Sequence, residues 1–306
     1  MDDGTLRELP EIALFLELNE DYREVIVEGS SDASLIGHFL QEKGIDVTVF
    51  AVDERVNIGS AHVTELGENV GARGRVVACA SYLAKCAASN RVTCIIDADF
   101  HYLTPDQVGE LECLLRTDYG ALELYGFNEA TLQRLFRVGL RASKDFDAST
   151  VVDALYSSLV DLFICRSVLH AFPTPPALLP PTKKNRVLIS SGQVQVDIDK
   201  LLKDTLNSSR DPAVRALKSS DVVGQVRQIR AKLSPDWRKF MNGHDCIELL
   251  AWYIGKVWPA LVRDDRVDMR KANNLAIALR LSLAVGELES ETMFKTLMRR
   301  VSDQAA

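Results

Sequence analysis

The chain has 306 residues, of which 47% are hydrophobic and 26% are charged, a balance typical of a folded protein with a sizeable core. No stretch reaches the roughly 18 consecutive apolar residues that a membrane span needs, and the acidic N-terminus is unlike a signal or transit peptide. Six cysteines without metal-ligand spacing favour buried, reduced thiols. We therefore expect a cytoplasmic protein that makes no membrane contact.

The net charge of −7 is unevenly distributed along the chain. From Lys200 onward, 19 Lys and Arg stand against 13 Asp and Glu, so this part carries +6 and the part before it carries −13. A basic region of this kind suits a polyanionic partner, and ordinary solvated helix faces explain it equally well.

In the first half, apolar strands alternate with helices. We expect helices over 31–43 and 75–89, a glycine-rich loop over 59–74, strands over 47–52, 91–97 and 113–117, and a helix capped by Asn128 that runs to residue 140. The order of these elements predicts parallel strands joined by right-handed crossovers.

The second half has mainly helical periodicity. Helices are expected over 147–170, 222–233, 245–257, 271–285 and 290–301, a proline-rich connector over 171–185 and a small hairpin over 186–197. With one boundary near residue 143, the sequence predicts an α/β domain over 1–143 and a mainly helical domain over 144–306.

Two apolar runs of the first half end abruptly in acidic residues. Residues 25–27 lead into Glu28, and residues 94–96 lead into Asp97 and Asp99. Such continuously apolar strands are typical of a parallel sheet covered on both faces, and ligands of these sheets bind beyond the carboxyl ends of the strands. We therefore expect Glu28, Asp97 and Asp99 to meet at one edge of the sheet.

Three carboxylates at one edge repel one another unless a cation lies between them. Mg²⁺, or Mn²⁺ in its place, takes oxygen ligands and needs few from the protein, so this pattern predicts a divalent metal site. The structural alternative is a set of strand-end acids that cap neighbouring helices.

Two other classes that place an acid after an apolar strand fit less well. A P-loop ATPase needs GxxxxGK[ST], and the stretch 67–76 lacks the Lys-Ser/Thr pair. A haloacid-dehalogenase phosphatase uses hhhhDxD early in the chain, followed by Thr or Val. Here the motif starts near residue 94 and continues with Phe100 and His101.

A strand ending in Glu28-Gly29, followed 69 positions later by Asp97-x-Asp99, resembles the Toprim domain, a catalytic module of topoisomerases, primases and OLD-family nucleases. The spacing of Glu28 and Asp32 is similar to the OLD-like form. His101 stands where topoisomerase-type members carry a third Asp, which argues against a topoisomerase.

Three further features resemble one bacterial branch of that family. They are Thr117-Asp118-Tyr119, the downstream Glu123, and Gly243-His244-Asp245 at the start of an apolar helix. This branch, the AriB-type effectors of the PARIS anti-phage system, is encoded beside an AAA or ABC-type ATPase. The Toprim resemblance covers about residues 20–140, and the resemblance to the branch covers most of the chain more loosely.

The resemblance implies roles for five acids. Glu28, Asp97 and Asp99 would be catalytic, and Asp32 and Glu123 would join them in holding one or two Mg²⁺ ions. Two such ions stabilise the attacking and leaving oxygens of phosphodiester cleavage. The structural alternative for Asp32 is to stabilise the N-terminus of a helix through the helix dipole. For Glu123 the alternative is an ordinary solvated side chain.

The resemblance therefore implies a metal-dependent nuclease, the toxic effector of an anti-phage system, released from a partner ATPase and active as a homodimer. RNA, in particular tRNA, is favoured over DNA as its substrate. The alternatives are a DNA-cleaving OLD-like nuclease and a Toprim-fold binding or sensor module without catalysis. A basic cluster of Lys183, Lys184 and Arg186 is a candidate for nucleic-acid contact, and a solvated loop explains it as well.

Overall fold

The computed structural model describes residues 6–105, 108–183, 186–233, 237–261 and 268–302. They belong to two compact units. The first comprises Met1–Ala98, Asp106–Asp118 and Ala284–Ala306, and the second comprises Asp99–Pro105 and Tyr119–Leu283. The chain passes between the units several times, so these units do not coincide with the expected ranges 1–143 and 144–306.

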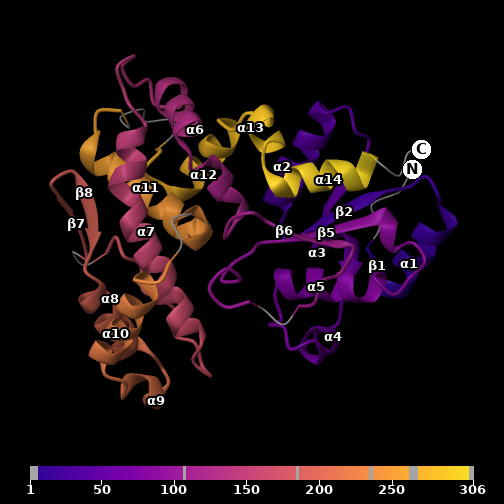
Figure 1. Ribbon diagram of the computed structural model, residues 1–306, viewed down its shortest axis with the longest axis horizontal. Coiled ribbons are helices and arrows are strands. Elements are labelled where there is room, and N and C mark those ends of the chain that lie inside the picture. Colours follow the sequence, from indigo (N-terminus) through magenta and orange to yellow (C-terminus); the bar gives the residue numbers. More distant parts are fainter. Residues whose placement is uncertain (1–5, 106–107, 184–185, 234–236, 262–267, 303–306) are drawn as a thin grey trace. The chain divides into compact units, whose positions relative to one another are not determined.

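A four-stranded parallel sheet with the strand order β3-β2-β5-β6 forms the centre of the first unit (Figure 1). Its strands are β2 (Glu24–Val27), β3 (Thr48–Ala51), β5 (Val92–Ile96) and β6 (Leu114–Arg116). Every residue of β2 and β5 is buried. The prediction of an α/β fold with a parallel sheet is confirmed. The two strands are buried throughout because the sheet is covered on both faces.

Helices cover both faces of this sheet (Figure 1). On one face, α1 (Leu9–Leu18) and α5 (Ala72–Leu83) share a hydrophobic core with Ile26 of β2 and with Cys94 and Ile96 of β5. These residues alternate along their strands, as the period of two in a pleated sheet requires.

The other face is covered by helices from opposite ends of the chain. The ring of Phe39 in α2 (Ser30–Glu42) lies 4.7 Å from the ring of Phe294 in α14 (Thr292–Ser302), measured between centroids. The backbone N–H of Met293 donates to Asp118 Oδ2 at 2.9 Å. These contacts tie the last helix to the first unit.

The remaining elements of the first unit are short. They are β1 (Arg7–Glu8), α3 (Val52–Arg55), β4 (Val56–Asn57), α4 (Ser60–Glu65), η1 (Ser89–Arg91) and α13 (Val285–Glu289). The expected loop over 59–74 is wrong at 60–65, where α4 forms, and from Ala72, where α5 begins, because the high glycine content of this stretch conceals both helices. Gly67 lies just beyond α4 with φ +74°, a conformation that glycine adopts without strain.

Among the described residues of the first unit, Arg55 of α3 and Glu24 of β2 form a fully buried ion pair. Arg55 Nη2 lies 2.7 Å from Glu24 Oε2, and both side chains have 0% exposure. The guanidinium carbon of Arg55 also lies 4.8 Å from the ring centre of Phe50. Removing two charges from water is costly, so this pair stabilises the fold only while both partners are present.

Helix α7 (Ser149–His170) is the centre of the second unit, and 13 of its 22 residues are buried. A helix that is apolar on all sides must be surrounded by other elements. In Figure 1, the β7–β8 hairpin, α10 and α11 lie along it. Over the described part of the chain, no helix is long and apolar enough to cross a membrane.

The second unit contains two strands and otherwise helical segments among its described residues. They are η2 (Leu122–Gly126), α6 (Glu129–Arg134), η3 (Leu135–Gly139), β7 (Val187–Ser190), β8 (Gln193–Val196), α8 (Ile198–Ser208), α9 (Pro212–Arg215), α10 (Ser219–Arg230), η4 (Trp237–Phe240), α11 (Gly243–Val257) and α12 (Ala272–Leu281). The predicted hairpin and the predicted Asn128 cap, which accepts the N–H of Thr131, are confirmed.

Candidate functional site

The sheet of the first unit changes its direction of growth between β2 and β5. From β2 the chain adds β3 on one side, and it then crosses back to add β5 on the other side. In open α/β sheets, ligands bind in the crevice beyond the carboxyl ends of the strands at such a switch point. Glu28 directly follows β2 and Asp97 directly follows β5. We call these two strand ends, with Glu28 and Asp97, the acidic edge.

Side-chain hydrogen bonds fix the acidic edge from both neighbouring strands. The N–H of Asp97 donates to Glu28 Oε1 at 2.9 Å, and the N–H of Ala98 donates to Thr117 Oγ1 at 2.9 Å. Thr117 is buried, and its own N–H donates to the Ile96 carbonyl at 3.0 Å. The structure therefore places the Glu28 carboxylate against the backbone of Asp97.

An arginine that the sequence did not single out lies at the acidic edge. Arg73, in the first turn of α5, donates from Nη1 to the carbonyl oxygen of Asp97 at 2.5 Å. Its Nε lies 4.0 Å from a carboxylate oxygen of Glu68. Arg73 thus adds positive charge where two acids meet. Its position within a glycine-rich stretch is a weak sequence signal.

Asp32 takes the capping role that was its structural alternative. Its Oδ2 accepts the N–H of Gly29, the residue before α2, at 3.2 Å. A carboxylate in the first turn also interacts favourably with the helix dipole. This capping bond holds Asp32 one turn beyond Glu28, and its role as a metal ligand stays a prediction.

Asp99 and Glu123 belong to the second unit and are both tied to the segment that begins α11. Asp99 donates its N–H to Gly120 O at 3.1 Å, and a Cβ on Gly120 would lie 2.3 Å from Met241 O. A Cβ on Gly243, the first residue of α11, would lie 2.6 Å from Glu123 Oε2. Glycine at both positions permits this close packing.

Glu123 lies at the N-terminal end of α11, where the helix dipole favours negative charge. Burial raises the pKa of the Cys246 thiol well above its ordinary value, and the negative charges of Glu123 and Asp245 raise it further. Asp245 is fully buried and forms a bidentate ion pair with Arg166 of α7, with N–O distances of 2.5 and 2.7 Å. Asn242 caps the helix by accepting the N–H of Asp245. The Gly243-His244-Asp245 motif therefore has a structural explanation.

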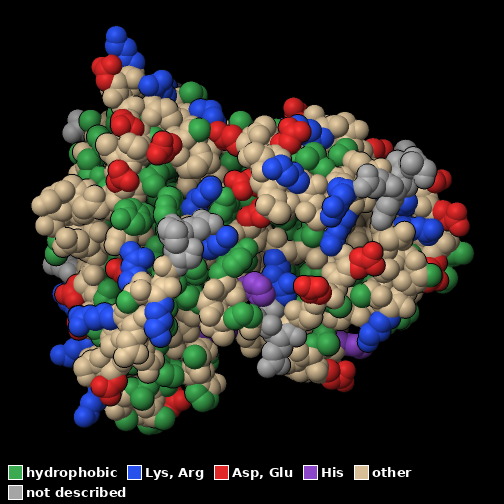
Figure 2. Space-filling model, viewed as in Figure 1, with side chains coloured by type: hydrophobic (Ala, Val, Ile, Leu, Met, Phe, Trp, Pro, Cys, Tyr) green, Lys and Arg blue, Asp and Glu red, His purple; other side chains and the backbone are tan. Residues whose placement is uncertain are grey.

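The basic cluster does not form a nucleic-acid surface around Arg186. Arg186 is buried, and its Nε and Nη2 lie 3.0 and 2.8 Å from Asp204 Oδ2, so it anchors the proline-rich connector instead. Lys183 is exposed, and Lys184 lies outside the described residues. On the face shown in Figure 2, basic and acidic side chains are interspersed.

The acidic edge has the donor chemistry of a magnesium site, although it is not a complete cage. Among the described residues, no three His, Cys, Asp or Glu side chains are grouped so that they could hold a metal ion. Mg²⁺ is commonly bound through one or two carboxylates plus substrate phosphates and waters. Glu28 and Asp97 fit that kind of site.

Asp99 has an unusual backbone conformation for a residue with a side chain, with φ of +45°. Asn and Gly tolerate this region, whereas a β-branched residue is strained there by about 1–3 kcal/mol. We therefore expect the free energies of unfolding of Asp99→Asn and Asp99→Gly, measured in urea, to lie within about 1 kcal/mol of that of the parent. Asp99→Val should be less stable.

The same variants test the role of the Asp99 carboxylate. A catalytic carboxylate requires that all three variants lose cleavage, and a fully active Asp99→Gly would show that Asp99 is not part of the site.

Comparison with known proteins adds no family assignment. No protein-family model matches this chain, and no curated protein matches it.

Proposed function

We propose that this chain is a metal-dependent nuclease of the Toprim type that cleaves phosphodiester bonds at the acidic edge. The observation that carries the proposal is the pairing of Glu28 with Asp97 at the switch point between β2 and β5. Ligands of open α/β sheets bind at such a point, so a ligand site accounts for the position of these two residues.

Glu28 and Asp97 would hold Mg²⁺ or Mn²⁺, and the sequence resemblance adds Asp32, Asp99 and Glu123 as further ligands. When bound, the cation supplies positive charge beside the scissile phosphate. The Glu28 carboxylate is suited to take a proton from attacking water, because its position is fixed by the Asp97 N–H. Arg73 offsets the negative charge that the acids and the phosphate bring together.

The resemblance also carries the biological part of the proposal. The chain would be the toxic effector of an anti-phage defence system, held inactive by a partner ATPase. RNA, in particular tRNA, is the preferred substrate, and DNA is the rival. This part rests on sequence motifs and not on the geometry of the acidic edge.

A second candidate is a Toprim-fold binding or sensor module without catalysis. It is favoured by the roles that the acids already have, since Glu28 accepts the Asp97 N–H and Asp32 caps α2. Strand-end acids with a purely structural purpose would form the same bonds.

Metal removal separates the two candidates. Purified protein, alone and with its ATPase, is incubated with total RNA and with plasmid DNA in Mg²⁺ or Mn²⁺, and cleavage is followed on gels. We expect cleavage that EDTA abolishes and excess Mg²⁺ restores. Cleavage that persists in EDTA would contradict a metal-dependent nuclease. The absence of cleavage of RNA and of DNA, both without and with the ATPase, would favour the binding module.

A further inference from the structure

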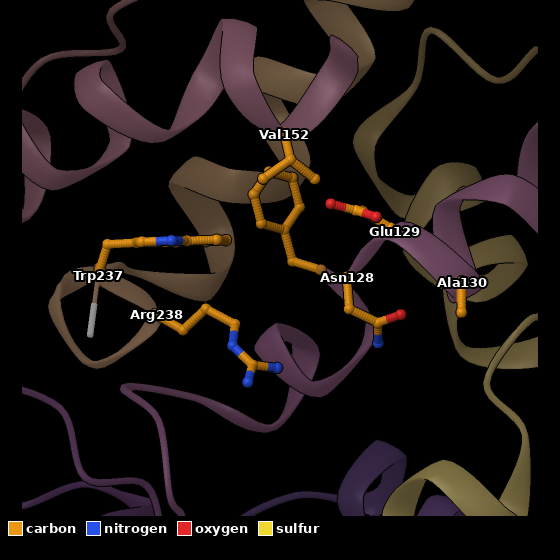
Figure 3. Close-up of a pocket in the computed structure, with 7 residues that line it drawn as sticks. Asn128, Glu129, Ala130, Val152, Trp237 and Arg238 are labelled. Carbon is orange, nitrogen blue, oxygen red and sulfur yellow. The ribbon is translucent and has the colours of Figure 1, made fainter. Parts of the chain in front are cut away.

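A pocket of about 480 Å³ lies in the second unit, and none of the five acids proposed as metal ligands lines it. Three segments line it: residues 127–130 at the start of α6, Val152 of α7, and Trp237 with Arg238 of η4. In Figure 3, Trp237 and Arg238 lie on one side of the view, and Glu129 and Ala130 lie on the other. Its volume lies within the range of about 300–1,000 Å³ that is usual for small-molecule sites.

One wall of the pocket is a flat aromatic surface. The indole of Trp237 is only partly buried, and its position is set by two other rings. Phe127 meets it edge-on at 6.0 Å between centroids, and Tyr156 lies at 6.1 Å. A tryptophan held in this way loses little conformational entropy when a flat ring stacks on it.

A fixed positive charge lies beside this surface. The guanidinium carbon of Arg238 lies 4.2 Å from the ring centre of Tyr119, a buried side chain that itself packs against Tyr125. The next residue, Lys239, is placed 5.4 Å from the ring of Tyr102. η4 thus presents one partly buried tryptophan followed by two basic side chains, and surfaces that bind single-stranded nucleic acid combine these two kinds of group.

The polar groups at the rim differ in what they can offer a ligand. Asn128 accepts the Thr131 N–H and donates to the Tyr125 carbonyl, so its amide serves the helix cap. Glu129 is exposed at the pocket and carries a carboxylate that accepts hydrogen bonds. In Figure 3 the Glu129 carboxylate lies toward Val152, and the guanidinium of Arg238 lies on the Asn128 side.

We propose that this pocket binds one unpaired nucleotide, with its base stacked on Trp237 and its phosphate at Arg238. A nucleotide contacts both the aromatic wall and the Arg238 guanidinium, which is held in place over Tyr119. Glu129 would accept a hydrogen bond from an exocyclic amino group of the base. The proposal rests on the proposed nuclease function only for the source of the nucleotide, a single strand of the substrate.

Binding can be tested without cleavage. A fluorescein-labelled ten-nucleotide single-stranded RNA is titrated with the full chain in EDTA, and the anisotropy gives Kd. We expect Trp237→Leu to weaken binding by about five- to a hundredfold, since stacking of one base accounts for that much. Trp237→Phe keeps a flat ring and should bind within about threefold of the parent. Arg238→Gln should weaken binding more than the charge-matched control Arg227→Gln, which removes an exposed arginine of the same unit.

Trp252→Leu, which changes a tryptophan of α11 that does not line the pocket, controls for general effects, and thermal melting checks that each variant is folded. A nucleoside monophosphate titrated in parallel distinguishes a free nucleotide from a nucleotide within a strand. A duplex RNA should bind equally well to Trp237→Leu and to the parent. The proposal is overturned if neither probe binds the parent, or if Trp237→Leu and Arg238→Gln behave like their controls.

The outcome is independent of the nuclease assay. If the protein cleaves RNA and Trp237→Leu binds RNA as tightly as the parent does, only the proposal of a nucleotide pocket is contradicted. A chain that binds through Trp237 and never cleaves would leave the pocket in place and contradict the nuclease.

Discussion

Replacing Arg55 with methionine is expected to lower the free energy of unfolding by about 3–5 kcal/mol. The substitution leaves the Glu24 carboxylate fully buried without the guanidinium that lies 2.7 Å from it. Water cannot reach that carboxylate in the folded state, so the cost of its desolvation is no longer offset. Urea unfolding followed by circular dichroism measures the loss.

Two comparisons show whether burial is the cause. Arg227→Met removes an arginine that pairs with Asp199 at 3.2 Å, but both side chains are mostly exposed, so we expect a loss well below about 1 kcal/mol. The double variant Glu24→Leu with Arg55→Met removes both buried charges and should recover much of the stability. Equal losses for Arg55→Met and Arg227→Met would contradict this explanation.

Glu28→Gln is expected to reduce cleavage by at least about a hundredfold while the fold is kept. Glutamine still offers a carbonyl oxygen to the Asp97 N–H, so the hydrogen bond that fixes the acidic edge remains. It lacks the negative charge that holds a cation and the basicity that takes a proton. Initial rates on RNA at saturating Mg²⁺, with thermal melting in parallel, measure the two effects separately.

The matched control for Glu28 is Glu42→Gln. Glu42 is an exposed glutamate at the far end of α2, the helix that begins two residues after Glu28. This variant changes the net charge equally and should keep full activity. Should Glu28→Gln cleave as fast as Glu42→Gln, Glu28 has only a structural role.

The parallel sheet could be predicted because its strands carry their own signal. The runs before Glu28 and Asp97 are apolar at every position, and the structure buries all residues of β2 and β5. Helix α8 was missed, because its 11 residues directly follow the hairpin and carry four buried residues on an otherwise polar surface. Helix α1 was not predicted, although its buried residues Leu9, Ile12, Ala13 and Leu16 have helical spacing.

The layout of the two units could not be predicted, because it depends on contacts between distant parts of the chain. The last helix joins the first unit through the Met293 N–H and Asp118, which are 175 residues apart, and through the ring contact between Phe39 and Phe294. An ion pair between Lys43 and Glu289 adds to these contacts. Near residue 143 the sequence pattern changes from alternating strands and helices to mainly helices. This change does not mark the point where the chain passes from one unit to the other.

The candidate site was predicted in part. That Glu28 and Asp97 lie at neighbouring strand ends follows from the geometry of parallel strands, and the Glu28 carboxylate accepts the Asp97 N–H there. Their joint role as metal ligands, with Asp99, stays a prediction. Arg73 was missed because a single arginine at the start of a helix has no distinctive pattern. Arg186 was misjudged, since its sequence neighbours are basic but its side chain is directed to Asp204 in the interior.

The most direct test of the central claim is sequencing of RNA and DNA ends from cells that express the parent, Glu28→Gln or Glu42→Gln. We predict discrete new RNA ends in cells with the parent and with Glu42→Gln, and none with Glu28→Gln at equal protein levels. The same new ends in cells that express Glu28→Gln would contradict a nuclease centred on the acidic edge.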